Sequence, residues 1–150
     1  MPTLAALLRP EAVVDLDATH AEDALHALAH AALGLVDDEL LTLEELLEAI
    51  YEREKLHSTA LGEGVAMPHV RLKQVKAFRT VLGRSREGIE YAAPDGEAVR
   101  LFLLIVGPEA QAEQYRKLMT RAARFLRNEA GALLGSDDFG GAARAALEDY

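Results

Sequence analysis

The sequence predicts an α/β fold in a single domain that spans residues 1–150, for three reasons. Short apolar runs typical of strands alternate with segments whose apolar residues recur at helical spacing. No internal repeat, low-complexity segment or linker rich in Pro or Ser divides the chain. A chain of 150 residues can bury roughly two thirds of the surface that its unfolded form would expose, so we expect one hydrophobic core.

The first half of the chain is expected to be mainly helical. A short helix at 3–8 precedes a first strand at 12–16, AVVDL. A longer helix covers Thr19–Gly34, with the threonine as N-cap, because apolar residues recur there every three or four positions. A second long helix covers 40–51, and the segment 52–64, EREKLHSTALGEG, is predicted to be a loop.

Three apolar runs in the second half are predicted to be strands. They are GVAMPHV at 64–70, AFRTVLGR at 77–84 and VRLFLLIVG at 99–107. The last run is so continuously apolar that we expect it to be buried on both faces. Between the last two runs, PDG at 94–96 predicts a turn.

The best-defined predicted helix covers 110–127. Its apolar residues, beginning with Tyr115, fall on one side at 100° per residue. Two short helices, at 129–136 and in DFGGAARAALEDY at 138–150, are predicted to close the chain, the second beginning near Ser136 or Asp137. The side opposite the apolar face carries five basic residues, Arg116, Lys117, Arg121, Arg124 and Arg127.

The charge of the chain argues against nucleic acid as a partner. The formal net charge is −9, whereas affinity for nucleic acid comes largely from neutralising phosphates. The charge is uneven, because residues 71–127 carry 12 bases and 6 acids, while residues 1–70 carry 3 bases and 14 acids. The basic segment begins directly after His69, where it can attract a phosphorylated partner or simply balance the acidic part of the same fold.

The sequence predicts a cytoplasmic protein without membrane insertion. No apolar run approaches the roughly 20 residues that cross a bilayer, and the first residues, MPTLAALLRPEAVV, lack the features of a secretory signal. The chain has no cysteine, which excludes disulfides, thiolate nucleophiles and thiolate metal sites.

His69 stands behind Pro68 at a place suited to chemistry. Proline has no N–H group, so the strand at 64–70 is expected to end as it reaches His69. Strand ends and the loops beyond them are where open α/β sheets carry their sites. Neutral imidazole is nucleophilic through one nitrogen, and its ordinary pKa of about 6.5 leaves much of it neutral near pH 7.

The residues around His69 suit a phosphoryl group. Gly62 and Gly64 allow the backbone to turn its N–H groups toward an anion. The hydroxyls of Ser58 and Thr59 and the guanidinium of Arg71 are further donors to phosphoryl oxygens, so these residues form the predicted phosphate site. The residues alone leave the alternative of a loop packed around a structural histidine.

Other phosphate chemistries are excluded by missing motifs. There is no GxxxxGK[ST] loop, no GxGxxG with a suitably spaced acid, and no acidic cluster for Mg²⁺. A nucleophilic serine in a GxSxG turn is also missing. His26 and His30, with Glu22, have a helical spacing that can bind a transition metal, but an exposed helix face is the commoner meaning, and we predict no metal site.

Residues 53–71, REKLHSTALGEGVAMPHVR, resemble the signature of type 2 enzyme IIA domains of the bacterial phosphoenolpyruvate:sugar phosphotransferase system (PTS). This is the fructose, mannitol and nitrogen-regulatory class, whose pattern is approximately RExxxSTGxGxGxAxPHxR. The order of the segments that follow, including PDGEAVRLFLLIVGPE, is similar as well. The resemblance implies a phosphotransferase/anion-transport-like α/β fold, in which a small mixed sheet of about four or five strands has helices on both sides.

The resemblance also implies a function. His69 would accept a phosphoryl group from the phosphohistidine of the carrier HPr or a paralogue, and pass it to a cysteine or histidine of an enzyme IIB component. No cofactor is implied, because the phosphoryl group arrives already activated. The alternative is a nitrogen-type regulatory module, in which phosphorylation of His69 controls binding to a partner protein instead of feeding sugar uptake.

The sequence departs from the family pattern at a second histidine. In the family this histidine faces the phosphorylated one, and the corresponding position here is Tyr115. Tyrosine donates a hydrogen bond but does not become a cation near neutral pH, so the departure affects catalysis directly. Ala60 stands where the family usually has glycine, and we expect no positive φ there. Arg53 and Glu54, which open the signature, are predicted to form an ion pair that positions the loop.

Overall fold

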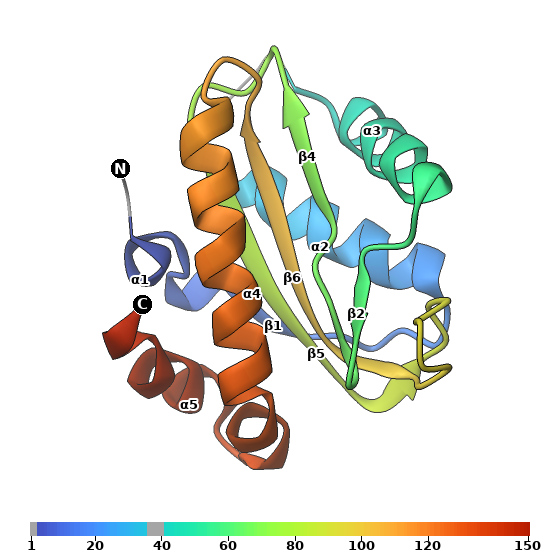
Figure 1. Ribbon diagram of the computed structural model, residues 1–150, viewed down its shortest axis with the longest axis vertical. Helices are drawn as coiled ribbons and strands as arrows, with labels where there is room; N and C mark the ends of the chain where they lie inside the picture. The colour runs from blue at the N-terminus through green and yellow to red at the C-terminus, as the bar shows by residue number, and fades with distance from the viewer. Residues whose placement is uncertain (1–2, 36–40) are drawn as a thin grey trace.

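A mixed sheet of six strands forms the centre of the protein, as the computed structural model of residues 3–35 and 41–150 describes it (Figure 1). The two longest strands, β5 (Arg79–Ile89) and β6 (Val99–Pro108), pair antiparallel. Strand β1 (Val13–Asp15) runs parallel to β5 on its outer side. The turn predicted at 94–96 connects β5 and β6, with the N–H of Gly96 donating to the carbonyl of Ala93.

The edge of the sheet beyond β6 is interrupted at Pro68. Two short strands, β3 (Val65–Ala66) and β4 (His69–Leu72), pair with β6 one after the other, both parallel to it, and β2 (Ala60–Gly62) pairs antiparallel with β3. The prediction that the strand ends at His69 was therefore wrong, because His69 begins a new strand. Proline lacks the N–H group that a continuous ladder needs, which explains the break. Strand β2 lies within the segment predicted to be a loop.

Helices cover both faces of the sheet, as predicted. Figure 1 shows α4 (Ala112–Gly135) in front of the sheet and α2 (Ala21–Leu35) behind it. Alternate residues of β6 point to opposite faces, and all of them except Arg100 are buried, which confirms the prediction of a strand buried on both faces. Leu101, Leu103 and Ile105 pack with the α4 face, whereas Phe102, Leu104 and Val106 pack with the α2 face.

The helix α3 (Leu43–Leu56) packs on the same side as α2 and is longer than predicted. It continues past Tyr51 into the predicted loop, while the predicted start at Leu40 lies outside the described residues. Two features stabilise the extra turn. Basic residues occupy the last turn, and the Arg53 guanidinium donates a hydrogen bond of 2.7 Å to the carbonyl of His57.

The face of α4 is shared with short helices at both ends of the chain. These are α1 (Leu4–Leu7), η1 (Pro10–Ala12), α5 (Phe139–Ala146) and η2 (Leu147–Asp149). The separate helix predicted at 129–136 is wrong, because α4 runs on to residue 135 and buries Leu133 along the same apolar face. No helix within 3–35 or 41–150 is long and apolar enough to span a membrane.

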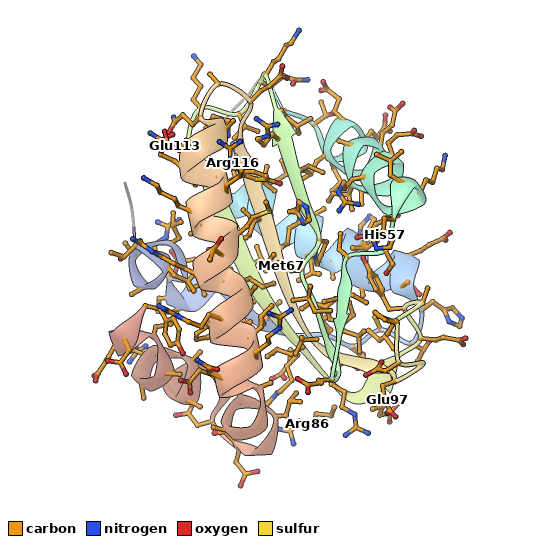
Figure 2. All side chains as sticks on the ribbon, in the orientation of Figure 1. His57, Met67, Arg86, Glu97, Glu113 and Arg116 are labelled. Atoms are coloured by element: carbon orange, nitrogen blue, oxygen red, sulfur yellow. The ribbon has the colours of Figure 1, made fainter. Side chains whose placement is uncertain are left out.

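The outer face of α4 is basic, as the sequence indicates, and Figure 2 shows Arg116 near its first turn. All five basic residues, Arg116, Lys117, Arg121, Arg124 and Arg127, are exposed. Two of them have neighbours on the protein itself. Lys117 lies 3.5 Å from the Glu113 carboxylate, and the Arg124 guanidinium lies 5.3 Å from the centre of the Tyr150 ring.

Candidate functional site

His69 is positioned by its pairing with the central strand. It is paired with Ile105 of β6, so its side chain shares the face of the sheet that α4 covers. Two residues further along β4, Arg71 falls on the same face, while Val70 packs into the core on the opposite face. Among the described strands, β4 pairs only with β6, so it lies at the open edge of the sheet, and the His69 ring is half-buried.

The hydrogen bonding of His69 defines which ring nitrogen is nucleophilic. Its Nδ1 atom lies 2.7 Å from the carbonyl oxygen of Met67. A carbonyl only accepts hydrogen bonds, so Nδ1 carries the hydrogen and Nε2 carries the lone pair. Within the described part of the chain, no protein group hydrogen-bonds to Nε2.

The surroundings of His69 favour its neutral form. Burial of the ring lowers the pKa of His69 below its ordinary value of 6.5, and the positive charge of Arg53 lowers it further. The hydrogen bond with Met67 and the negative charge of Glu54 act in the opposite direction, to a smaller extent in sum. The ring is therefore neutral at pH 7 and can act as a nucleophile.

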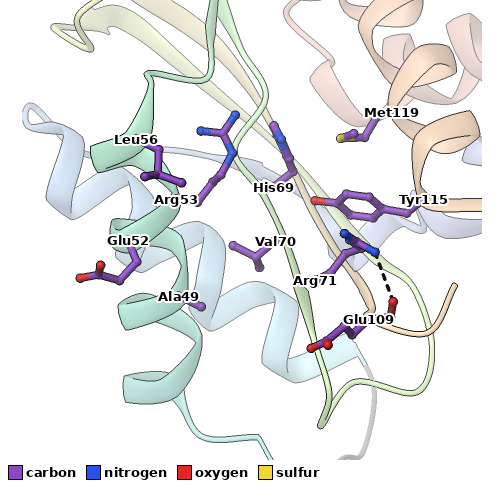
Figure 3. A pocket seen from close by; sticks show the side chains of 10 residues that line it. All are labelled: Ala49, Glu52, Arg53, Leu56, His69, Val70, Arg71, Glu109, Tyr115 and Met119. Carbon is purple, nitrogen blue, oxygen red and sulfur yellow. Dashed lines mark hydrogen bonds between the residues drawn. The ribbon is translucent and has the colours of Figure 1, made fainter. Parts of the chain in front are cut away.

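The His69 ring lies in a cavity of about 580 Å³ between α3 and α4. Figure 3 shows Arg53 of α3 and Tyr115 of α4 on opposite sides of His69. Leu56, at the end of α3, is 82% exposed at the rim. The other lining residues are Ala49, Glu52, Val70, Arg71, Glu109 and Met119.

Tyr115 of α4 faces the His69 ring across the cavity. The centroids of the two rings lie 6.1 Å apart, and Tyr115 is 5% exposed. Burial raises the pKa of the Tyr115 hydroxyl far above its ordinary value of 10, against the opposing charges of Arg71 and Arg53. Tyr115 is therefore a neutral hydrogen-bond donor throughout the physiological pH range.

Two guanidinium groups supply positive charge to the cavity. Arg71 lies with its guanidinium carbon 5.5 Å from the centre of the Tyr115 ring and donates a hydrogen bond of 3.2 Å to the backbone carbonyl of Glu109. Arg53 donates to the His57 carbonyl, and each guanidinium has five N–H donors, so donors of both remain for a ligand. Sequence reasoning overlooked Arg53 as a cavity residue, although it opens the family signature.

The predicted ion pair between Arg53 and Glu54 is wrong, because Glu54 binds Thr59. The backbone N–H of Thr59 donates to the Glu54 carboxylate at 3.1 Å, and the Thr59 hydroxyl donates to the other carboxylate oxygen. Ser58 is also engaged locally, since its hydroxyl donates to the Tyr91 carbonyl at 3.2 Å. Both hydroxyls thus hold the loop after α3, and neither residue lines the His69 cavity.

Gly62 and Gly64 form the turn between β2 and β3, with φ angles of 87° and 81°. The Gly64 carbonyl accepts a hydrogen bond from the N–H of Leu101 on β6. His69 is paired with Ile105 of the same strand, four residues further on, so the turn lies about 13 Å from His69 along the strand. The structure therefore brings His69, Arg71 and Tyr115 into one cavity, but not the four predicted phosphate ligands. Phosphate binding by Ser58, Thr59 and the two glycines stays a prediction.

Ala60 has no positive φ, as expected.

The described residues contain no group of three or more His, Cys, Asp or Glu side chains that could hold a metal ion. His26 and His30 are both exposed on α2.

Comparisons with known proteins place this chain in a family. Residues 7–132 match the family described as "Phosphoenolpyruvate-dependent sugar phosphotransferase system, EIIA 2". A nitrogen regulatory protein of Bradyrhizobium diazoefficiens is 32% identical over 124 residues, which are 82% of this chain and 79% of that protein. The PTS system fructose-like EIIA component of Escherichia coli is 30% identical over 123 residues, which are 81% of this chain and 80% of that protein.

A solved structure gives the same result for the fold. The crystal structure of nitrogen regulatory protein IIA-Ntr from Neisseria meningitidis superimposes with a TM-score of 0.86 at 26% identity, covering 96% of this chain and 98% of that one. Both the nitrogen-regulatory and the sugar-specific branches thus contain proteins similar to this chain. The chain belongs to the type 2 EIIA family of the phosphoenolpyruvate-dependent sugar phosphotransferase system.

Proposed function

We propose that this chain, residues 1–150, is one EIIA type 2 domain that acts as a cytoplasmic phosphoryl-relay protein. His69 accepts a phosphoryl group from phospho-HPr or a paralogue and passes it to an enzyme IIB component. The observation that carries the proposal is the free lone pair on Nε2 of a neutral imidazole, at a cavity that two guanidinium groups line.

The transfer balances without any further reactant. Nε2 of His69 attacks the phosphorus atom, a new P–N bond forms, and the P–N bond of the donor phosphohistidine breaks, returning its electron pair to the donor imidazole. The hydrogen bond from Nδ1 to Met67 stabilises the positive charge that develops on the His69 ring. Arg53 and Arg71 stabilise the phosphoryl oxygens, because phosphoryl transfer depends mainly on positioning and electrostatics.

Onward transfer reverses the same chemistry. The nucleophile of the IIB component, a cysteine or histidine, attacks the phosphorus atom, and the electron pair of the broken P–N bond returns to Nε2. Tyr115 contributes a neutral hydroxyl donor where a histidine would contribute a cation, so it stabilises the phosphoryl oxygens less.

A regulatory role is the second candidate function. In this alternative, the phosphorylation state of His69 controls binding to a partner protein, and onward transfer to IIB is slow or absent. The similarity to two nitrogen regulatory proteins and the tyrosine at position 115 favour it.

The test is phosphorylation of the pure protein with phosphoenolpyruvate, enzyme I and HPr, followed by mass spectrometric mapping under non-acidic conditions. The relay predicts one phosphoryl group, on His69, and none in a His69→Ala variant. His57→Ala is the matched control, because only the backbone carbonyl of His57 takes part in the contacts of the cavity wall. A IIB component is then added: loss of the label to IIB favours the relay, whereas retention favours the regulatory role.

A further inference from the structure

A chain of hydrogen bonds connects Glu54 to the His69 ring. The Glu54 carboxylate accepts the backbone N–H and the hydroxyl of Thr59. The carbonyl of Thr59 accepts the N–H of Met67 at 3.0 Å, and the carbonyl of Met67 accepts the Nδ1–H of His69 at 2.7 Å. The ring that carries the nucleophilic nitrogen thus ends a series of contacts that begins at a carboxylate on α3.

Burial makes water a poor substitute for these contacts. Thr59 is 4% exposed and Met67 is 7% exposed, so few water molecules reach the middle of the chain. The residue after Met67 is Pro68, which has no N–H and whose carbonyl accepts from Ile105 at 3.0 Å. The position of the Met67 carbonyl is therefore fixed by two backbone hydrogen bonds on either side of it. One joins Pro68 to Ile105 of β6, and the other joins the N–H of Met67 to Thr59.

Position 54 requires a carboxylate because Thr59 directs two hydrogen-bond donors at it. A carboxylate accepts both, whereas the carboxamide of glutamine offers one acceptor oxygen and an NH₂ group that faces another donor. If Thr59 shifts, the Met67 carbonyl is no longer fixed. The imidazole is then free to adopt its other tautomer, in which Nε2 carries the hydrogen and has no lone pair for phosphorus.

We propose that Glu54 is a positioning residue for the phosphoryl acceptor, which acts through Thr59 and Met67 to keep His69 in the tautomer with a free lone pair on Nε2. The effect of Glu54 on the tautomer of His69 is inferred only from the hydrogen bonds described above, while the expected effect on phosphorylation rests on the proposed function. Glu54 itself does not line the His69 cavity.

The test is the ¹⁵N NMR spectrum of His69 in protein labelled with ¹⁵N-histidine, at a pH where the ring is neutral. The wild-type protein is expected to show a single tautomer with hydrogen on Nδ1. Glu54→Gln and Thr59→Val are expected to show a mixture of both tautomers in a protein that remains folded. Thr59→Ser keeps the hydroxyl and the backbone N–H, so this variant is expected to show the single tautomer of the wild type.

The matched control is Glu48→Gln, which removes an exposed carboxylate from the same helix without touching the chain of contacts. It is expected to leave the tautomer unchanged. The proposal is overturned if Glu54→Gln and Thr59→Val keep the pure Nδ1–H tautomer, or if Glu48→Gln disturbs it as much as they do. A general loss of folding is detected separately, from the amide spectrum of each variant.

The rate of phosphorylation from phospho-HPr gives the functional readout. Glu54→Gln is expected to slow it about five-fold, the effect of one weakened hydrogen bond, with Thr59→Ser close to the wild type. An unchanged rate in a variant with mixed tautomers would contradict the role in positioning. If the wild-type protein is not phosphorylated on His69 at all, the proposed function fails, and the NMR result still decides the tautomer part.

Discussion

His69 and Tyr115 face each other across the cavity, with ring centroids 6.1 Å apart and ring planes inclined by 55°. One ring comes from the edge strand β4 and the other from the first turns of α4. Arg71 lies over the Tyr115 ring, which places a cation beside the tyrosine hydroxyl without making the hydroxyl itself charged. The site therefore combines a neutral nucleophile with a neutral donor and two fixed positive charges.

Replacing Tyr115 by histidine is expected to accelerate onward transfer. Tyr115→His adds a group that can become a cation beside the phosphoryl oxygens, whereas Tyr115→Phe removes the donor and is expected to slow transfer. Transfer from the phosphorylated protein to a IIB component, followed over pH 6 to about 8, measures both. Equal rates for all three proteins would remove Tyr115 from the mechanism.

Phosphoryl acceptance is expected to fall to half of its maximum only at a pH below about 6.5. The reason is that burial lowers the pKa of His69, so the neutral ring persists to lower pH than in an exposed histidine. Initial rates from phospho-HPr, corrected with a donor-only control, test this. A rate that already halves near pH 7 would show that the His69 pKa is raised instead.

The same shift has a consequence for stability. Because the folded-state pKa of His69 lies below that of the unfolded chain, protonation favours the unfolded state. The buried neutral ring makes its full contribution to the free energy of unfolding above about pH 6.5, the ordinary pKa of histidine. This contribution is lost as the pH falls from there through the lower pKa of the folded protein. A His69→Gln variant is therefore expected to lose less stability than the wild type between pH 7 and about 5.

Gly107 provides the room that the Tyr115 ring occupies. A Cβ atom at this position would lie 2.8 Å from Cδ1 of Tyr115 and 2.9 Å from Phe78. Gly107→Ala is therefore expected to displace the tyrosine and to lower the free energy of unfolding by about 1–3 kcal/mol. Chemical denaturation measures the loss, and the tyrosine ring resonances report the displacement.

Gly131→Ala is the matched control for this prediction. Gly131 lies inside α4, and a Cβ atom there would meet no other atom within 4 Å. Alanine is favoured over glycine in a helix, so this variant is expected to gain about 0.5–1 kcal/mol. A Gly107→Ala protein as stable as the wild type would mean that the Tyr115 ring is free to move.

The parts of the fold that depend on local pattern could be predicted from the sequence. The continuous apolar run of β6 predicted a strand buried on both faces, and the apolar side of α4 predicted the residues that pack on the sheet. Pro68 indicated a break in the strand, but the sequence did not show that a new strand begins at His69. That strand depends on the pairing of His69 with Ile105, which is a contact between distant segments. The last turn of α3 was not predicted because the apolar periodicity of the helix ends before it. This turn is stabilised instead by the hydrogen bond from the Arg53 guanidinium to the carbonyl of His57.

The candidate site was predictable to a similar extent. The resemblance to the family indicated His69, Arg71 and Tyr115 as site residues, and all three line one cavity. The contacts of Ser58 and Thr59 with the protein itself could not be predicted in this way. Ser58 donates to Tyr91, which is 33 residues away, and the signature does not show that Thr59 donates to the Glu54 carboxylate. A hydroxyl in a sequence motif carries no sign of whether it faces a ligand or the protein.

The position of the phosphoryl group on the ring tests the central claim most directly. In protein labelled with ¹⁵N-histidine and phosphorylated by phospho-HPr, coupling between ³¹P and ¹⁵N identifies the nitrogen that carries phosphorus. Because Nδ1 donates to Met67, coupling is expected at Nε2 of His69 alone. Coupling at Nδ1, or phosphorus on a different residue, would contradict the account.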